Sequence, residues 1–242
     1  MRADLGDALA SVEWGESQLH SLGRMFANWK DLNIRISIKQ PDPQSGKKVA
    51  VLRKKSPLPP IINAGVGSVI NSFRAALDML AAALARRNGV PASEDTHFRV
   101  YRSILDFIDP KDGMEAKKWL SSRDKSVLKS LRPYDGGNAL LWSLHQLDIL
   151  RKHERLVTVA VEPHRVIAIS EKFPVLFRPV TSMEDETELF EFSGHVPDPE
   201  ATFEVTILFD EISLPVHRKP VFPTLAEFHN ATLDIVAMFD VP

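Results

Sequence analysis

The sequence contains no cysteine among its 242 residues. A disulfide-stapled mini-domain is therefore excluded, and a reducing compartment suits the chain. A structural zinc site would have to use histidine and carboxylate ligands alone. We accordingly expect no metal site and no cofactor.

Long apolar runs are missing as well. No window approaches the ~18 consecutive apolar residues of a membrane span. The first residues, MRADLGDALASVEWGESQ, include acidic side chains throughout and lack the apolar core that a signal peptide requires. We expect a cytoplasmic protein without a membrane partner.

Several common enzyme motifs are absent. The sequence has no GxxxxGK[ST] and no GxGxxG after a predicted strand, which argues against the usual nucleoside triphosphate and dinucleotide sites. It also lacks HExxH and GxSxG, so zinc-protease and serine-hydrolase chemistry have no support. The pair Gly65 and Gly67 is too short a signal for a phosphate loop, and we expect it to ease the entry into a helix.

The charge is nearly balanced, with 30 Lys plus Arg against 32 Asp plus Glu and a net charge of −2. Such a chain has no general attraction for nucleic acid or anionic lipid. Its most basic stretches, residues 53–55 and 151–155, are short. A nucleic-acid partner would therefore need a local basic patch, and the identity of any partner stays open at this point.

Hydrophobic spacing predicts a mainly helical region over residues 1–155. Apolar residues recur at three- and four-residue intervals in its helices, and a period of two predicts a β-hairpin. A basic last turn, Gly89 and Pro91 mark the end of the central helix. The predicted elements are helices at 4–30, 67–87, 111–131 and 139–155, a hairpin at 32–55 with its turn at 41–48, and an extended piece at 98–101.

A period of two dominates residues 156–242 and predicts an antiparallel sheet with strands at 156–161, 165–169, 188–192 and 203–209. A final helix follows, for which Thr224 and Glu227 form a candidate capping box. We therefore predict an α+β fold with an N-terminal helix, a small hairpin, a central buried helix, a His-bearing helix and a C-terminal sheet plus helix. The two regions are expected to pack as one domain.

Arg74 and Asp78 stand four residues apart, so they share one face of the central helix and can pair. They are the only charged residues between Val66 and Ala85, which indicates that this helix is covered on most sides. The cover could come from this chain or from a second subunit, so a homo-oligomer is possible. The pair is either a core ion pair or part of a site.

The His-bearing helix places His145, Asp148 and Lys152 on one stripe, whereas His153 projects roughly 100° from Lys152. We take Leu140, Leu144, Leu147 and Leu150 as its apolar stripe. On that basis Asp148 and Lys152 are either an ordinary solvent-facing pair or part of a site. His145 is either a hydrogen-bonded interior histidine or, with an ordinary pKa near 6.5, an acid or base.

The stretches GSVINSFRAALDMLAAAL and LRPYDGGNALLWSLHQLDILRKHERL resemble an uncharacterised bacterial family. Its members show an Arg-x-x-Leu-Asp helix and, after a Pro-Tyr turn, a helix with His-x-Leu-Asp and Lys-His. The resemblance implies that the two helices associate, and it covers about the middle third of the chain. It departs at Ser68 and Arg151, where the family tends to carry acidic residues.

Two functions fit these residues. In the first, which we favour, the protein is a non-catalytic ligand-binding or protein-interaction module, and Arg74, Asp78, His145, Asp148, Lys152 and His153 are its candidate binding residues. In the second, it is a metal-independent ribonuclease or RNA-binding protein with a remote resemblance to HEPN-type helical domains. Arg74 or Lys152 would then stabilise the phosphorane while His145 or His153 moves protons. HEPN nucleases carry an Arg with a His four to six residues later on one helix, and no such pair occurs here.

Overall fold

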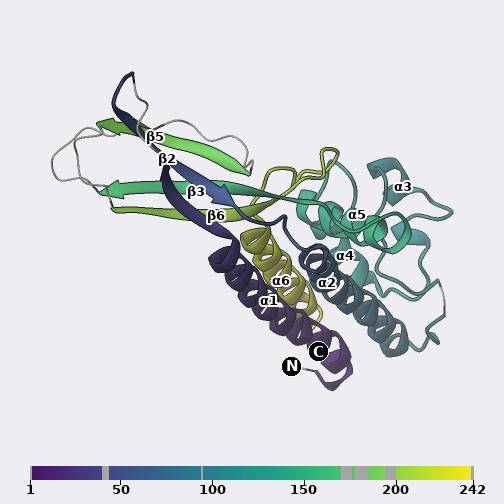
Figure 1. Cartoon of the computed structure of the whole chain (residues 1–242). Coiled ribbons are helices and arrows are strands. Elements are labelled where there is room, and N and C mark those ends of the chain that lie inside the picture. The colour runs from purple at the N-terminus through teal and green to yellow at the C-terminus, as the bar shows by residue number, and fades with distance from the viewer. Residues whose placement is uncertain are drawn as a thin grey trace.

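The computed structural model describes residues 2–39, 44–93, 95–169, 176–177, 185–193 and 200–240. Its elements follow the predicted order of helices first, strands second and one helix last (Figure 1). They are η1 (Ala3–Leu5), α1 (Gly6–Asn33), β1 (Ile34–Lys39), β2 (Lys47–Lys54), α2 (Pro60–Arg87), α3 (Ile104–Ile108), η2 (Met114–Ala116), α4 (Ser122–Leu131), α5 (Ala139–His153), β3 (Val159–Ile169), β4 (Leu176–Phe177), β5 (Glu186–Ser193), β6 (Glu200–Phe209) and α6 (Val221–Met238). The α+β prediction is confirmed.

The central helix α2 is covered by α1, α5 and α6 of the same chain. It begins at Pro60, seven residues before the predicted start, because proline suits the first turn of a helix. Gly67 therefore lies inside the helix and does not mark its entry. By length and composition alone α2 could cross a membrane, but 67% of its most apolar window is buried within the fold.

The strands extend from one end of the long helices and form two antiparallel sheets (Figure 1). The four-stranded sheet has the order β1-β2-β5-β4, so β5 pairs with β4, which precedes it in sequence, and with β2 of the N-terminal hairpin. The second sheet is the pair β3-β6, in which the two predicted strands at 156–161 and 165–169 merge into β3 with an irregularity at Pro163. The predicted turn at 41–48 lies partly outside the described residues.

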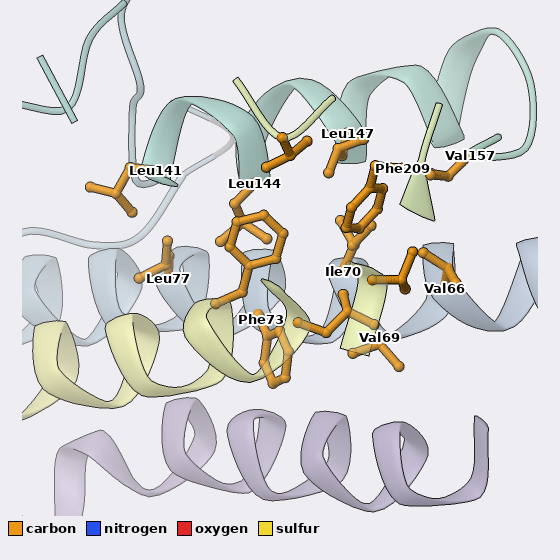
Figure 2. Close-up of a cluster of buried hydrophobic side chains, with 14 of the residues drawn as sticks. Val66, Val69, Ile70, Phe73, Leu77, Leu141, Leu144, Leu147, Val157 and Phe209 are labelled. Carbon is orange, nitrogen blue, oxygen red and sulfur yellow. The ribbon is translucent and has the colours of Figure 1, made fainter. Parts of the chain in front are cut away.

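One hydrophobic cluster joins both regions of the chain. Figure 2 shows Leu141, Leu144 and Leu147 of α5 facing apolar side chains of α2. Phe209, at the end of β6, is fully buried in the same cluster. The helices α2 and α5 thus associate through this core.

Two further local predictions are wrong. The helix predicted at 111–131 is broken into η2 and α4, because Asp109 accepts from the backbone N–H groups of Lys111 and Asp112 and the chain turns at Gly113. A Cβ at Gly113 would lie 2.4 Å from the carbonyl oxygen of Asp109, so only glycine fits there.

The capping box at the final helix is also wrong. Helix α6 begins at Val221 after Pro220 and has no side-chain cap. Thr224 lies within its first turn, is buried, and donates its backbone N–H to the carbonyl oxygen of Pro220 at 3.1 Å.

Candidate binding groove

Arg74 and Asp78 hold the backbone of Phe98 from both sides. The Arg74 guanidinium is buried and donates to Asp78 Oδ1 at 2.7 Å and to the carbonyl oxygen of Phe98 at 2.6 Å. Asp78 Oδ1 also accepts from the backbone N–H of Phe98 at 2.9 Å. Both terminal nitrogens of the buried cation are therefore engaged, which offsets much of the cost of its desolvation.

The clamp at Phe98 fixes the path of the segment that follows it. Tyr101 donates its backbone N–H to the carbonyl oxygen of Pro133 at 2.8 Å and accepts from the N–H of Asp135 at 3.2 Å. Its ring is buried and meets the ring of Phe107 edge to face, with centroids 5.4 Å apart. Residues 98–107 are thus held between α2 and the turn that precedes α5.

The turn before α5 depends on two glycines. Gly136 has a φ of +75°, a conformation that side chains other than glycine rarely adopt. A Cβ at Gly137 would lie 2.4 Å from the carbonyl oxygen of Arg132. Asn138 then caps the helix, because its side chain accepts from the N–H of Leu141 at 3.0 Å.

Asp148 is buried and lies on the face of α5 that meets α2. Lys152 Nζ lies 2.6 Å from Asp148 Oδ2, and Arg151 Nη2 lies 3.3 Å from Oδ1. Arg151 also donates to Asn71 Oδ1 of α2 at 2.7 Å. Its side chain packs on Gly67 of α2, where a Cβ would lie only 2.6 Å from Arg151 Cδ. The arginine that departs from the family pattern therefore links the two helices.

These positions argue against the interpretation of Asp148 and Lys152 as a solvent-facing pair. Lys152 is partly exposed, but Asp148 is only 3% exposed. The buried face of α5 runs through Leu141, Leu144, Leu147 and Asp148, whereas Leu140 and Leu150 are only partly buried. The apolar stripe is thus rotated from the predicted one toward Asp148.

A second face of α5 lines an open groove of about 930 Å³. Trp142, His145, Gln146 and Ile149 recur at the spacing of one helix face and form one wall. The facing wall comes from residues 99–112, with contributions from Asp135 and Glu154. We call this cavity the α5 groove.

His145 is the one candidate residue that lines the α5 groove. Burial is the main cause that lowers the pKa of His145 from 6.5 to about 4, and the nearby charge of Arg74 contributes against the opposing effect of Asp148. The ring is therefore neutral at pH 7, with one nitrogen donating and the other accepting. Its Nδ1 is buried and has no hydrogen-bond partner within the described residues.

The facing wall includes Arg99 and Asp112, which form an ion-pair cluster with Lys117. Arg99 Nη2 lies 2.7 Å from Asp112 Oδ2, and Lys117 Nζ lies 2.7 Å from Oδ1. The hydrogen bonds from Arg99 and Lys117 hold the pKa of Asp112 well below its usual range. The Arg99 guanidinium also stacks over Tyr101 at 5.1 Å from the ring centroid, and burial raises the pKa of Tyr101 to about 12.

The six predicted residues therefore do not converge on one pocket. Arg74 and Asp78 clamp Phe98, while Asp148 and Lys152 belong to the link between α2 and α5. Neither Arg74 nor Lys152 lines the α5 groove. His153 is exposed at the end of α5 and does not line it either.

The sequence interpretation missed Trp142, Gln146 and Ile149. Their spacing with His145 is visible in the sequence, but four leucines on the same helix gave a more obvious apolar stripe. The facing wall has no comparable signal, since it depends on the clamp at Phe98. Within the described residues no group of three or more His, Asp or Glu side chains could hold a metal ion.

No protein-family model, no curated protein and no solved structure matches this chain. The resemblance to the bacterial family therefore stays a prediction from the residues quoted above.

Proposed function

We propose that the protein is a non-catalytic binding module and that the α5 groove is its binding site. The observation that carries the proposal is the second face of α5, on which Trp142, His145, Gln146 and Ile149 line a cavity instead of the core. Ligand sites are typically clefts of about 300–1,000 Å³ with aromatic walls and a few polar groups. The α5 groove has this size and includes the aromatic side chains of Tyr101 and Trp142, but most of its lining is charged or polar.

His145 supports binding because of its protonation state. A neutral imidazole offers both a donor and an acceptor, so it can orient a polar ligand against the ring of Trp142. A buried polar atom without a partner costs about 1–3 kcal/mol. The unpartnered Nδ1 of His145 is itself buried, so a ligand in the groove would relieve this cost only if the ring turned toward it.

The ribonuclease alternative is less well supported. The two residues proposed to stabilise the phosphorane do not line the groove: both terminal nitrogens of Arg74 are engaged by Asp78 and Phe98, and Lys152 pairs with Asp148. His153 does not line the groove that His145 lines. The proposal therefore assigns binding rather than RNA cleavage to this face, in a cytoplasmic protein as the sequence predicts.

The test is a thermal-shift screen with a fragment library, followed by affinity measurements on four variants. His145→Gln and Trp142→Ala alter the groove, whereas His20→Gln and Trp14→Ala remove the same side-chain types from exposed positions on α1. Compounds that bind the groove should lose affinity with the first two variants only. Equal affinities in all four variants would refute the proposal.

A further inference from the structure

We propose that the α5 groove receives a segment of a partner protein in which basic side chains alternate with apolar ones. This inference rests on the proposed function, since it names the ligand class of the same site. It follows from the charges of the groove and from the apolar side chains beside it.

The groove is acidic. Its lining includes the guanidinium groups of Arg99 and Arg102 but five carboxylates. Arg99 is neutralised by Asp112 in the ion-pair cluster. The remaining carboxylates outnumber Arg102, so the groove complements a positively charged occupant.

Three of these carboxylates can meet a cation without breaking a salt bridge. Asp106 accepts from the hydroxyl of Ser103 at 2.9 Å and forms no ion pair within the described residues. Asp135 and Glu154 are exposed and form none there either. The fourth, Asp109, is occupied by backbone N–H groups of its own loop. Lysine or arginine side chains of a partner would give Asp106, Asp135 and Glu154 their missing counter-charges.

The apolar part of the surface lies on α3, the short helix that also carries Asp106. Ile104, Leu105 and Ile108 are 51%, 71% and 58% exposed, while Phe107 between them is buried in the core. Three large aliphatic side chains gathered on one exposed helix of five residues are typical of an interaction surface. A free polyamine would leave them uncovered, whereas a peptide with apolar residues beside its basic ones would bury them.

The aromatic wall fits the same occupant. Trp142 is half-buried in the groove, and an indole face attracts a guanidinium or ammonium group. Neutral His145, 6.4 Å from Trp142 between ring centroids, can accept from such a group or from a peptide N–H. One occupant thus meets the charge and the aromatic wall inside the groove, and it covers the exposed aliphatic side chains, which do not line the groove, by continuing over α3.

The experiment uses the full chain and two fluorescein-labelled peptides, GLRGLRG and its matched acidic counterpart GLEGLEG, with affinity read from fluorescence anisotropy. The arginine peptide should bind more tightly, and its affinity should fall as salt is raised. The variant carrying Asp106→Asn, Asp135→Asn and Glu154→Gln should weaken that binding about tenfold, because three surface charges are lost. Its matched control carries Glu13→Gln, Asp31→Asn and Glu227→Gln on exposed positions of α1 and α6 and should bind normally.

The apolar contribution is tested separately. Leu105→Ser should weaken the arginine peptide several-fold, whereas Leu32→Ser, at a residue that is 59% exposed on α1, should not. Equal binding of the two peptides, or no effect of the acidic-to-amide variant, would overturn the proposal. A dimer of the free protein that dissociates with Leu105→Ser would also overturn it, because a second copy would then occupy the surface.

The outcomes also separate this inference from the function on which it rests. If fragments bind the groove but the arginine peptide does not, the basic partner is wrong and the binding function stands. If neither fragments nor peptides respond to changes at Trp142 and His145, both proposals fail.

Discussion

Arg74 of α2 donates from Nη2 to the backbone carbonyl oxygen of Phe98 at 2.6 Å. The bond joins a helix that is almost free of charge to an irregular segment 24 residues later in the chain. That segment leads into the wall of the α5 groove that faces Trp142 and His145. The buried arginine is thus a positioning residue for the proposed binding site.

Arg74→Leu should lower the free energy of unfolding by about 3 kcal/mol, because it removes the cation that pairs with Asp78 and leaves the Phe98 carbonyl without its donor. Arg86→Ala, at an exposed position of the same helix, should change it by less than about 1 kcal/mol. Urea unfolding of both variants provides the measurement. A loss for Arg74→Leu as small as for Arg86→Ala would contradict the clamp.

Arg151 and its neighbour Lys152 both approach Asp148, but they should differ in importance. Arg151→Ala should cost about 1–3 kcal/mol, since it breaks the bond to Asn71 and weakens the pairing of a buried carboxylate. Lys152→Ala should cost less than about 1 kcal/mol, because the lysine head is exposed to solvent. Thermal unfolding of the two variants tests the order, and a larger effect of Lys152→Ala would show that α2 and α5 are not linked through Arg151.

Stability should fall in acid through His145. Its pKa is about 4 in the folded protein against an ordinary 6.5, so between these pH values the unfolded chain binds a proton that the folded chain does not. The free energy of unfolding therefore decreases as the pH is lowered through this window, by about 3 kcal/mol at most from this group. His145→Gln should remove that part of the pH dependence, with His20→Gln as the control for loss of an imidazole. An unchanged slope in His145→Gln would rule out the lowered pKa.

Gly137→Ala should destabilise the protein by about 1–3 kcal/mol, because the new Cβ would collide with the carbonyl oxygen of Arg132 in the turn before α5. Gly6→Ala, where a Cβ meets nothing within 4 Å, is the matched control. Differential scanning calorimetry measures both. Equal melting temperatures would mean that the turn can relax without cost.

The sequence predicted much of the fold because local patterns determine it. Residues 139–155 were predicted as a helix and α5 spans Ala139–His153, since a capping asparagine and a regular apolar spacing mark it. The pairing of β5 with β2 could not be predicted in the same way. It joins segments more than 130 residues apart, and the opposite charges of the two strands, which form the ion pairs Lys47–Glu191 and Arg53–Glu186, are too common a pattern to identify the partner.

The candidate site was predicted only in part. Arg74 and Asp78 could be paired from their spacing. Their contacts with Phe98 could not be predicted, because they use its backbone carbonyl and N–H, which do not depend on the residue type. His145 was selected for its chemistry and does line the α5 groove, whereas Asp148 was placed on the wrong side of the helix. A leucine-rich helix offers two adjacent stripes, and only the position of α2 decides which one is buried.

The most direct test of the binding function uses the four tryptophans as probes. In two-dimensional ¹H–¹⁵N NMR spectra each indole N–H gives one signal, and Trp142→Phe and Trp14→Phe assign two of them. The binding function predicts that fragments selected by thermal shift move the Trp142 signal and leave the signal of exposed Trp14 in place. Fragments that bind without moving the Trp142 signal would contradict it.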